Sequence, residues 1–411
     1  MAGAARDAMH RGVMQPIATP DHLARVRYEI RGPLARRAHE IERQGHEVIK
    51  LNIGNPALFG FRMPDALRDA VAEHLPQADG YCHQKGIVQA REAVAADLTA
   101  RGVAGIDADD VFMGNGVSEL ILMTLEALLR PGDEVLLPAP DYPLWTAAVA
   151  LTGATPVYYA CPESRGFVPD PDELDRLVTP RCRAIVMINP NNPTGAVYPA
   201  AVVRAIARVA ERHSLVLFSD EIYDRILYDG ATHEPAALHC TETLCATFGG
   251  LSKVYRACGL RTGWVVFSGQ RGPAAKYLQA VELLASLRLC ANVPGQWAVA
   301  PALAHEQGIV ALTAPDGRLG RQRAAVLEGV RRSRHLRLAT PHGALYAFIA
   351  AHTPGFDDER FAMDLLERER VLVVPGSSFN LDDRTYFRVT LLPEPDTLAE
   401  VFRRIERLLD G

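Results

Sequence analysis

The sequence predicts an α/β protein built around a mainly parallel β-sheet. From residue 111 onward, short apolar runs rich in β-branched residues alternate with amphipathic helical patterns. Such alternation is typical of a parallel sheet that helices cover on both faces. With 411 residues, of which 48% are hydrophobic, the chain is long enough to bury a large core in roughly two to three domains.

The alternation can be followed element by element. Strand-like VFMGNG precedes a helical SELILMTLEALL, EVLLPAP precedes DYPLWTAAVALTG, and RAIVMINP precedes PAAVVRAIARVAERH; LVLFSD and TLCATF are further strands. Beyond residue 296 come longer helices, RLATPHGALYAFIA, a helical FAMDLLERER, VLVVPGSSF, YFRVTLL and a closing amphipathic helix, DTLAEVFRRIERLLDG. We therefore expect a large domain over 51–296, a smaller α+β domain over 297–411, and an arm and helix over 1–50 that pack on the smaller domain.

Composition argues against several classes of partner. The formal net charge is −5 and the arginines are interleaved with acids, so we expect no nucleic-acid partner. No apolar run approaches the length of a membrane span, and the first residues lack the apolar core of a signal peptide, so we expect no membrane partner and a cytoplasmic location. The seven cysteines contain no CxxC pair, so neither a disulfide framework nor a metal site is expected.

Five segments that follow strands are candidates for a binding site. Ligands of parallel sheets bind beyond the carboxyl ends of the strands, where this chain has GNGVSE, PAPDYP, NPNNPTG, SDEIYD and GGLSK. Each segment is rich in turn formers, so an ordinary turn explains each one taken alone. Only their combination favours a site.

GNGVSE lies between a strand and a helix, where free backbone N–H groups and the helix dipole favour an anion. It is not a dinucleotide fingerprint, because Glu119 stands at the third glycine position, and the chain has no Walker-type phosphate loop. The alternative is a plain turn in which Ser118 caps the helix.

Three polar residues in the later segments are candidates for ligand contacts. Asp220 ends an apolar strand, where it is a helix cap, a solvated acid, or a buried carboxylate that pairs with a cationic ring nitrogen. Tyr223 could reach the same ligand, and Asn192 is a candidate donor to a ligand oxygen, although local turn formation also explains its loop.

Lys253 is one of only four lysines among 44 basic residues. Its neighbours Gly249, Gly250 and Ser252 let the backbone approach another group closely. Lysine can lose its proton and act as a nucleophile and base, which arginine cannot do. Arg261 would be the nearby cation, suited to grip a phosphate.

In this order, the motifs resemble those of the class I, fold-type I aminotransferases, which use pyridoxal 5′-phosphate. The resemblance extends from LNIGNP at residue 51 to YFRVTLL at residue 391. More narrowly, RYEIRGP, LNIGNPALFGF, LRLCANVP and PHGALY resemble the bacterial glutamate–pyruvate (alanine) aminotransferases. The resemblance implies a large domain with a mainly parallel seven-stranded sheet plus a smaller α+β domain.

The resemblance also implies roles around the cofactor ring. Lys253 would form the internal aldimine and then move the proton between the substrate Cα and the cofactor. Asp220 would keep the pyridine nitrogen protonated, Tyr223 and Asn192 would hold the O3′ oxygen, and Tyr142 would stack on the ring.

For the phosphate, the resemblance implies contacts from Val117, Ser118 and Arg261. Tyr81 matches a tyrosine that reaches the phosphate from the neighbouring subunit, which implies a homodimer.

For the substrate, Arg388 matches the arginine that binds the α-carboxylate, and Gly54 and Asn192 are also expected to contact substrate. Tyr28 and Arg31 lie in a segment expected to fold over the mouth of the site, with Arg31 gripping the side-chain carboxylate of glutamate.

The implied reaction is ping-pong transfer that converts L-alanine and 2-oxoglutarate to pyruvate and L-glutamate. Gly250, His342 and the loop CHQKG depart from the common pattern or fit it loosely, and they bear on the substrate range. The alternatives are another amino donor, such as valine or an aromatic amino acid, or lyase or decarboxylase chemistry on the same cofactor. A regulator that uses this fold as a sensor would need a DNA-binding module, for which few residues precede the first helical segment.

Overall fold

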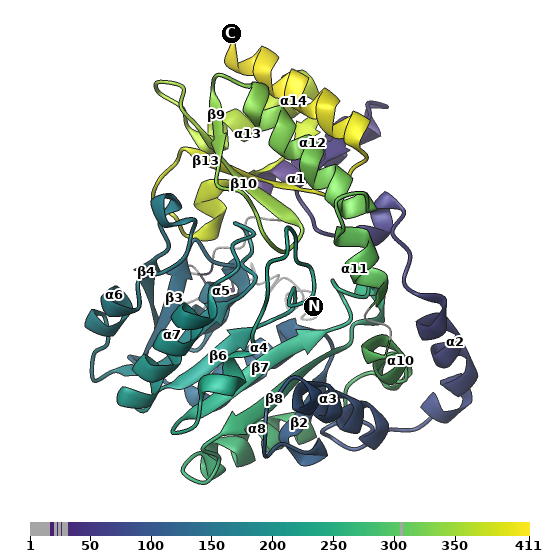
Figure 1. Ribbon diagram of the computed structural model, residues 1–411, viewed down its shortest axis with the longest axis vertical. Coiled ribbons are helices and arrows are strands. Elements are labelled where there is room, and N and C mark those ends of the chain that lie inside the picture. The colour runs from purple at the N-terminus through teal and green to yellow at the C-terminus, as the bar shows by residue number, and fades with distance from the viewer. Residues whose placement is uncertain (1–16, 20–22, 24–25, 27–31, 305–306) are drawn as a thin grey trace, which may run out of the picture.

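The computed structural model describes residues 17–19, 23, 26, 32–304 and 307–411 (Figure 1). Its centre is a seven-stranded sheet with the strand order β2-β8-β7-β6-β5-β3-β4. The strands are β2 (Val111–Gly114), β3 (Glu134–Ala139), β4 (Thr155–Ala160), β5 (Cys182–Ile188), β6 (Val216–Asp220), β7 (Leu244–Gly250) and β8 (Gly263–Gly269). All neighbours from β4 to β7 are parallel, whereas β8 runs antiparallel to β7 and to β2. The predicted mainly parallel seven-stranded sheet is confirmed.

Helices cover both faces of this sheet because successive strand residues point to opposite sides. On β5, Val186 and Ile188 join a hydrophobic cluster with the helices α4, α5 and α8. Ile185 and Met187 belong to the cluster on the other face, to which α3 and α7 contribute. The helices of this part are α2 (Asp65–His74), α3 (Val88–Ala100), α4 (Val117–Leu128), α5 (Pro143–Leu151), α6 (Pro171–Arg176), α7 (Ala200–Arg212), α8 (Ala275–Leu287), α9 (Val293–Gln296) and α10 (Val299–Leu303).

A second, antiparallel sheet lies above the first in Figure 1, together with α12, α13 and α14. Its strand order is β12-β13-β10-β9. The elements of this part are α11 (Gln307–Thr313), α12 (Arg318–Arg332), β9 (Leu336–Leu338), β10 (Tyr346–Ala351), α13 (Asp358–Glu369), β11 (Val371–Leu372), β12 (Val374–Pro375), β13 (Tyr386–Thr390) and α14 (Pro395–Leu409). The buried face of α14 packs against α12 and α13, as the predicted amphipathic pattern requires.

The first described helix, α1 (Pro33–Arg43), packs on α13. Ala38 and Ile41 of α1 are buried against Leu366, and Arg37 forms an ion pair with Glu367. The short strand β1 (Ile49–Lys50) then pairs in parallel with β11.

Two connections fix the antiparallel sheet over the carboxyl ends of the parallel strands. Leu51 donates its N–H to the carbonyl of Leu372 at 2.8 Å and accepts from the N–H of Thr390 at 3.0 Å. Asp141, in the loop after β3, donates its N–H to the Phe379 carbonyl at 3.0 Å and accepts from Asn380 Nδ2 at 2.7 Å. These bonds place β13 and β10 opposite the segments that were predicted to bind a ligand.

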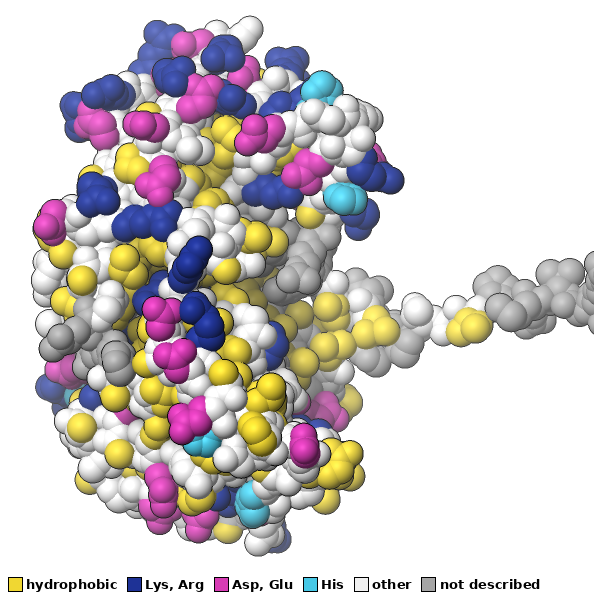
Figure 2. All heavy atoms as spheres, turned by 90° about the vertical axis from the view of Figure 1, so that its right-hand side faces the viewer, with side chains coloured by type: hydrophobic (Ala, Val, Ile, Leu, Met, Phe, Trp, Pro, Cys, Tyr) yellow, Lys and Arg dark blue, Asp and Glu magenta, His cyan; other side chains and the backbone are white. Residues whose placement is uncertain are grey.

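The surface carries charges of both signs. On the face shown in Figure 2, Lys and Arg side chains are interspersed with Asp and Glu over the upper part of the molecule. Within the described ranges, no helix combines the length and the apolar character needed to cross a membrane.

Candidate active site

The predicted ligand-binding edge is built by consecutive strand ends. Asp220 is the last residue of β6, Asn192 follows β5, and Lys253 follows β7. Because β5, β6 and β7 are parallel neighbours, their carboxyl ends meet at one edge of the sheet. Tyr142, half-buried, lies directly before α5, in the loop that follows β3.

The amine of Lys253 lies against the segment that links the two sheets. Its Nζ donates a hydrogen bond to the carbonyl oxygen of Gly54 at 2.7 Å. Gly54 is itself packed on Tyr346, and a β-carbon at residue 54 would collide with the Tyr346 hydroxyl. Glycine at 54 therefore allows the backbone to come close to both the lysine and the tyrosine.

Asp220 is a buried carboxylate, 3% exposed. Trp145 Nε1 donates to its Oδ2 at 3.0 Å and the N–H of Ile222 donates to its Oδ1 at 3.3 Å. Burial raises the pKa of Asp220 to about 6, while the nearby cation of Lys253 acts in the opposite direction. Both hydrogen-bond donors are neutral, so the ionised carboxylate would be stabilised by a further cation.

Arg388 projects from β13 toward the same edge and is 2% exposed. Its Nη1 donates to Asn192 Oδ1 at 2.8 Å, and its Nη2 donates to the Asn52 carbonyl oxygen at 2.5 Å. The guanidinium also lies over the rings of Tyr346 and Phe379, at 4.3 and 4.8 Å from their centroids. These contacts fix the orientation of the guanidinium plane. The side-chain oxygen of Asn192 thus already accepts a hydrogen bond from Arg388. Asn192 would contact a ligand oxygen through its amide nitrogen, Nδ2, which is the donor.

Tyr346 connects these groups, although the sequence did not single it out. Its hydroxyl lies 3.0 Å from the Tyr223 hydroxyl, and the two rings meet edge to face. Burial raises the pKa of Tyr223 well above its usual value, so this hydroxyl stays protonated at neutral pH. Trp145 was also missed as the partner of Asp220. Tyr346 stands in PHGALY and Trp145 in DYPLWTAAVALTG. In each case the signal available from the sequence was an aromatic residue where a loop meets a strand or a helix.

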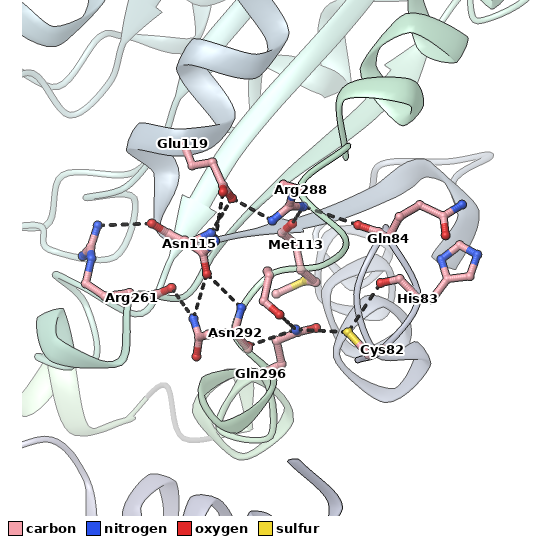
Figure 3. Close-up of polar contacts among 11 residues, drawn as sticks. Cys82, His83, Gln84, Met113, Asn115, Glu119, Arg261, Arg288, Asn292 and Gln296 are labelled. Carbon is pink, nitrogen blue, oxygen red and sulfur yellow. Dashed lines mark hydrogen bonds and ion pairs between the residues drawn. The ribbon is translucent and has the colours of Figure 1, made fainter. Parts of the chain in front are cut away.

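The predicted anion site lies at the amino end of α4. Gly116, at φ +82°, precedes the helix, so Ser118 is not the N-cap that the turn alternative supposed. Arg261 lies against this loop: its Nη2 is 3.4 Å from the Asn115 carbonyl oxygen, and a β-carbon at Gly116 would collide with it (Figure 3). Val117 and Ser118, the first two residues of α4, therefore begin the helix beside a guanidinium.

The remaining predicted residues are more scattered. Tyr81 is 81% exposed, so its side chain points to solvent in the single chain. Tyr28 and Arg31 lie outside the described residues. His342 is half exposed, with Nδ1 3.6 Å from Asp229 Oδ2. At Gly250, a β-carbon would lie 3.0 Å from the Thr262 carbonyl oxygen, so a larger residue there would need a small backbone shift.

Comparisons with known proteins agree with this architecture. The sequence profile described as "Aminotransferase class I and II" matches residues 46–405. The chain is 45% identical to glutamate-pyruvate aminotransferase AlaA of Escherichia coli K12 over 97% of this chain and 99% of that protein. It is also 45% identical to an alanine aminotransferase of Mycobacterium tuberculosis H37Rv, over 93% and 90% of the two chains.

Solved structures are similar over nearly the whole chain. The crystal structure of an aminotransferase from Escherichia coli has a TM-score of 0.94 at 45% identity, covering 96% of this chain and 99% of that one. The alanine aminotransferase of Pyrococcus furiosus has a TM-score of 0.91 at 31% identity, covering 96% and 100%. This chain therefore belongs to the class I and II aminotransferase family.

Proposed function

We propose that this protein is a pyridoxal 5′-phosphate-dependent aminotransferase that transfers the amino group of L-alanine to 2-oxoglutarate, giving pyruvate and L-glutamate. The observation that carries the choice of substrates is the 45% identity, over 97% of the chain, to an enzyme named glutamate-pyruvate aminotransferase. The match covers nearly all of both chains, so no large segment of this chain lacks a counterpart in that enzyme.

The described residues fit the two charged ends of the proposed cofactor. At one end, Arg261 and the first N–H groups of α4 suit a phosphate. A β-carbon at Gly263 would lie 2.6 Å from the Val117 backbone nitrogen, so glycine there keeps the helix start open. At the other end, the buried Asp220 has neutral donors and suits a protonated ring nitrogen.

The bound cofactor would supply an aromatic ring that accepts the electron pair left on the substrate Cα when its proton is removed. In this proposal Asp220 would hold a proton on the ring nitrogen, Tyr142 would pack on the ring face, and Tyr223 and Asn192 would donate hydrogen bonds to the ring oxygen. Lys253 would hold the cofactor through its amine and, when that amine is free, would move the proton that leaves the substrate Cα.

Arg388 binds the α-carboxylate of the substrate in this proposal. Its fork is held in one plane by Asn192 and by the rings of Tyr346 and Phe379, so little side-chain freedom remains to be lost on binding. The carbonyl oxygen of Gly54 accepts a hydrogen bond from Lys253 Nζ. A carboxylate on Arg388 would therefore orient the substrate Cα relative to Lys253. Tyr28 and Arg31 remain proposed contacts at the mouth of the site.

We also propose that the protein acts as a homodimer in which Tyr81 reaches the phosphate of the neighbouring subunit. Exposed apolar side chains at Leu283, Leu287 and Leu289 support an interface there, because they are 60%, 73% and 51% exposed. The turn after α8 lies beside the segment that follows Tyr81, since Arg288 Nη2 is 3.4 Å from the Gln84 carbonyl oxygen. One surface would thus contain both the apolar residues and Tyr81.

The proposal also includes the division into domains and the location in the cell. The two separate sheets support a large domain over 51–296 and a small domain over 297–411, with the α1 region packed on the latter. All seven cysteines are unpaired, which supports a reducing, cytoplasmic environment.

The function is tested by a panel of amino donors assayed with 2-oxoglutarate and added cofactor. Alanine is expected to have the highest kcat/KM. A higher value for valine, aspartate or an aromatic amino acid would replace the proposed donor. Release of carbon dioxide or ammonia from the amino acid, without a 2-oxo acid acceptor, would replace transfer by decarboxylase or lyase chemistry.

A further inference from the structure

An ion pair lies next to the loop that precedes α4, where the phosphate is proposed to bind. Glu119 is in the first turn of α4, and Arg288 directly follows α8, 169 residues away in the chain. Arg288 Nη1 and Glu119 Oε2 are 2.7 Å apart, and the side chains are only 15% and 28% exposed (Figure 3). Partial burial makes such a pair stronger than one in open solvent.

The carboxylate of Glu119 holds the loop that precedes α4. Its Oε2 accepts from the Asn115 backbone N–H at 2.7 Å, and its Oε1 accepts from Asn115 Nδ2 at 2.9 Å. On its other side, Asn115 Oδ1 accepts from the Asn292 N–H at 2.8 Å, and Asn292 Nδ2 donates to the Arg261 carbonyl oxygen at 2.8 Å. Asn115 is therefore fixed between Glu119 and the residues that position Arg261 (Figure 3).

Glu119 creates an electrostatic problem that Arg288 solves. A carboxylate in the first turn of α4 competes with a bound phosphate for the positive end of the helix dipole. Arg288 neutralises this charge, and its other branch donates to the Met113 carbonyl oxygen at 2.6 Å and approaches the Gln84 carbonyl oxygen. The hydrogen bonds of Glu119 are thus kept without leaving a net negative charge behind the anion site.

We propose that Arg288 is a positioning residue for the cofactor phosphate: by pairing with Glu119 it keeps the Asn115–Gly116 loop in place and cancels the charge that would repel the anion. This inference rests on the proposed function, since the anion is the phosphate of the proposed cofactor. Arg288 acts through Glu119 and Asn115.

The test compares pyridoxal 5′-phosphate with pyridoxal, which lacks the phosphate, as ligands of the cofactor-free full chain. Arg288→Met is expected to weaken the binding of pyridoxal 5′-phosphate by about 10- to 100-fold, the range for leaving a charged partner unpaired, and to leave the affinity for pyridoxal unchanged. Arg288→Lys keeps the cation and should retain most of the affinity. The double variant Glu119→Gln with Arg288→Met should recover most of the loss, because the repelling charge is gone.

The control is Arg181→Met, which breaks another arginine–glutamate pair, one in which the arginine is more exposed. Arg181 pairs with Glu134 at the amino end of β3, the opposite edge of the sheet, with Nε 2.8 Å from Oε1. This variant should bind both ligands like the unmodified chain. Circular dichroism monitors folding of each variant. If Arg288→Met does not fold, Glu119→Gln alone decides: its amide oxygen can still accept from the Asn115 N–H and hold the loop, while the negative charge is gone, so it should bind pyridoxal 5′-phosphate at least as tightly as the unmodified chain.

Equal weakening for both ligands by Arg288→Met would overturn the inference, because it would indicate a general structural role. A double variant no better than Arg288→Met, or a Glu119→Gln variant that loses phosphate selectivity, would also overturn it. If the unmodified chain bound neither ligand, the proposed function itself would fail, which is a distinguishable result.

Discussion

Replacement of Asp220 by asparagine isolates the charge of the buried carboxylate. The asparagine has nearly the same shape, and its oxygen can still accept from Trp145 Nε1 or the Ile222 N–H. The substitution therefore removes the ionisable group with little change in packing. In the cofactor-free protein, we expect it to abolish a pH-dependent loss of stability.

The magnitude follows from the pKa of Asp220. Burial raises this pKa from 3.8 to about 6, a difference worth roughly 3 kcal/mol. Between these values the folded state binds more protons than the unfolded state, so the stability of the unmodified chain falls as the pH rises from about 4 to about 6. The asparagine variant lacks this contribution. The free energy of unfolding of the variant minus that of the unmodified chain should therefore increase by roughly 3 kcal/mol across this window.

Urea unfolding of the cofactor-free proteins, at several pH values from 4 to 7, measures this difference. Contributions from other titrating groups cancel because they occur in both proteins. Asp382→Asn is the control for replacing a carboxylate at an exposed position, where substitutions change stability little. A difference for Asp220→Asn that does not change between pH 4 and pH 6 would refute the idea that burial destabilises the ionised carboxylate until a cation binds.

Three further substitutions test the proposed roles. Lys253→Arg should keep the fold by circular dichroism but lose turnover and the borohydride-stable attachment of the cofactor, because a guanidinium stays protonated; substantial turnover would contradict this. Tyr346→Phe removes the hydroxyl next to Tyr223 but keeps the ring under Arg388, so kcat should fall about two- to tenfold with little change in KM; a change confined to KM would speak against it. Arg388→Lys keeps the charge but loses the planar fork, so KM for both alanine and 2-oxoglutarate should rise about 10- to 100-fold, and unchanged values for either would exclude this carboxylate site.

The parallel core was predictable because its strands are buried on both faces and so appear as continuous apolar runs. β5 and β6 are examples, with almost every residue buried. β4, TPVYYA, lies at the edge of the sheet with two exposed and three partly exposed positions, which weakens the apolar pattern, and it was not identified as a strand from the sequence. An edge strand needs less hydrophobic surface, and propensity alone then identifies it poorly.

In the candidate site, residues that end strands could be identified from the sequence, whereas residues that approach from the other sheet could not. Asp220 and Lys253 follow apolar runs, so their place at the binding edge follows from the topology of parallel strands. The contact of Tyr346 with Tyr223 depends on how the antiparallel sheet is docked, across 123 residues of chain. From the sequence, Glu119 only excluded a dinucleotide fingerprint. Its pairing with Arg288 could not be predicted, because the two residues meet only in the folded chain.

Transfer of labelled nitrogen tests the central claim most directly. The purified protein is incubated with ¹⁵N-labelled L-alanine, 2-oxoglutarate and pyridoxal 5′-phosphate, and the products are identified by mass spectrometry. We predict ¹⁵N-labelled glutamate and an equal amount of pyruvate, both absent from the Lys253→Arg variant. Unlabelled glutamate, or pyruvate formed together with free labelled ammonia, would contradict the account.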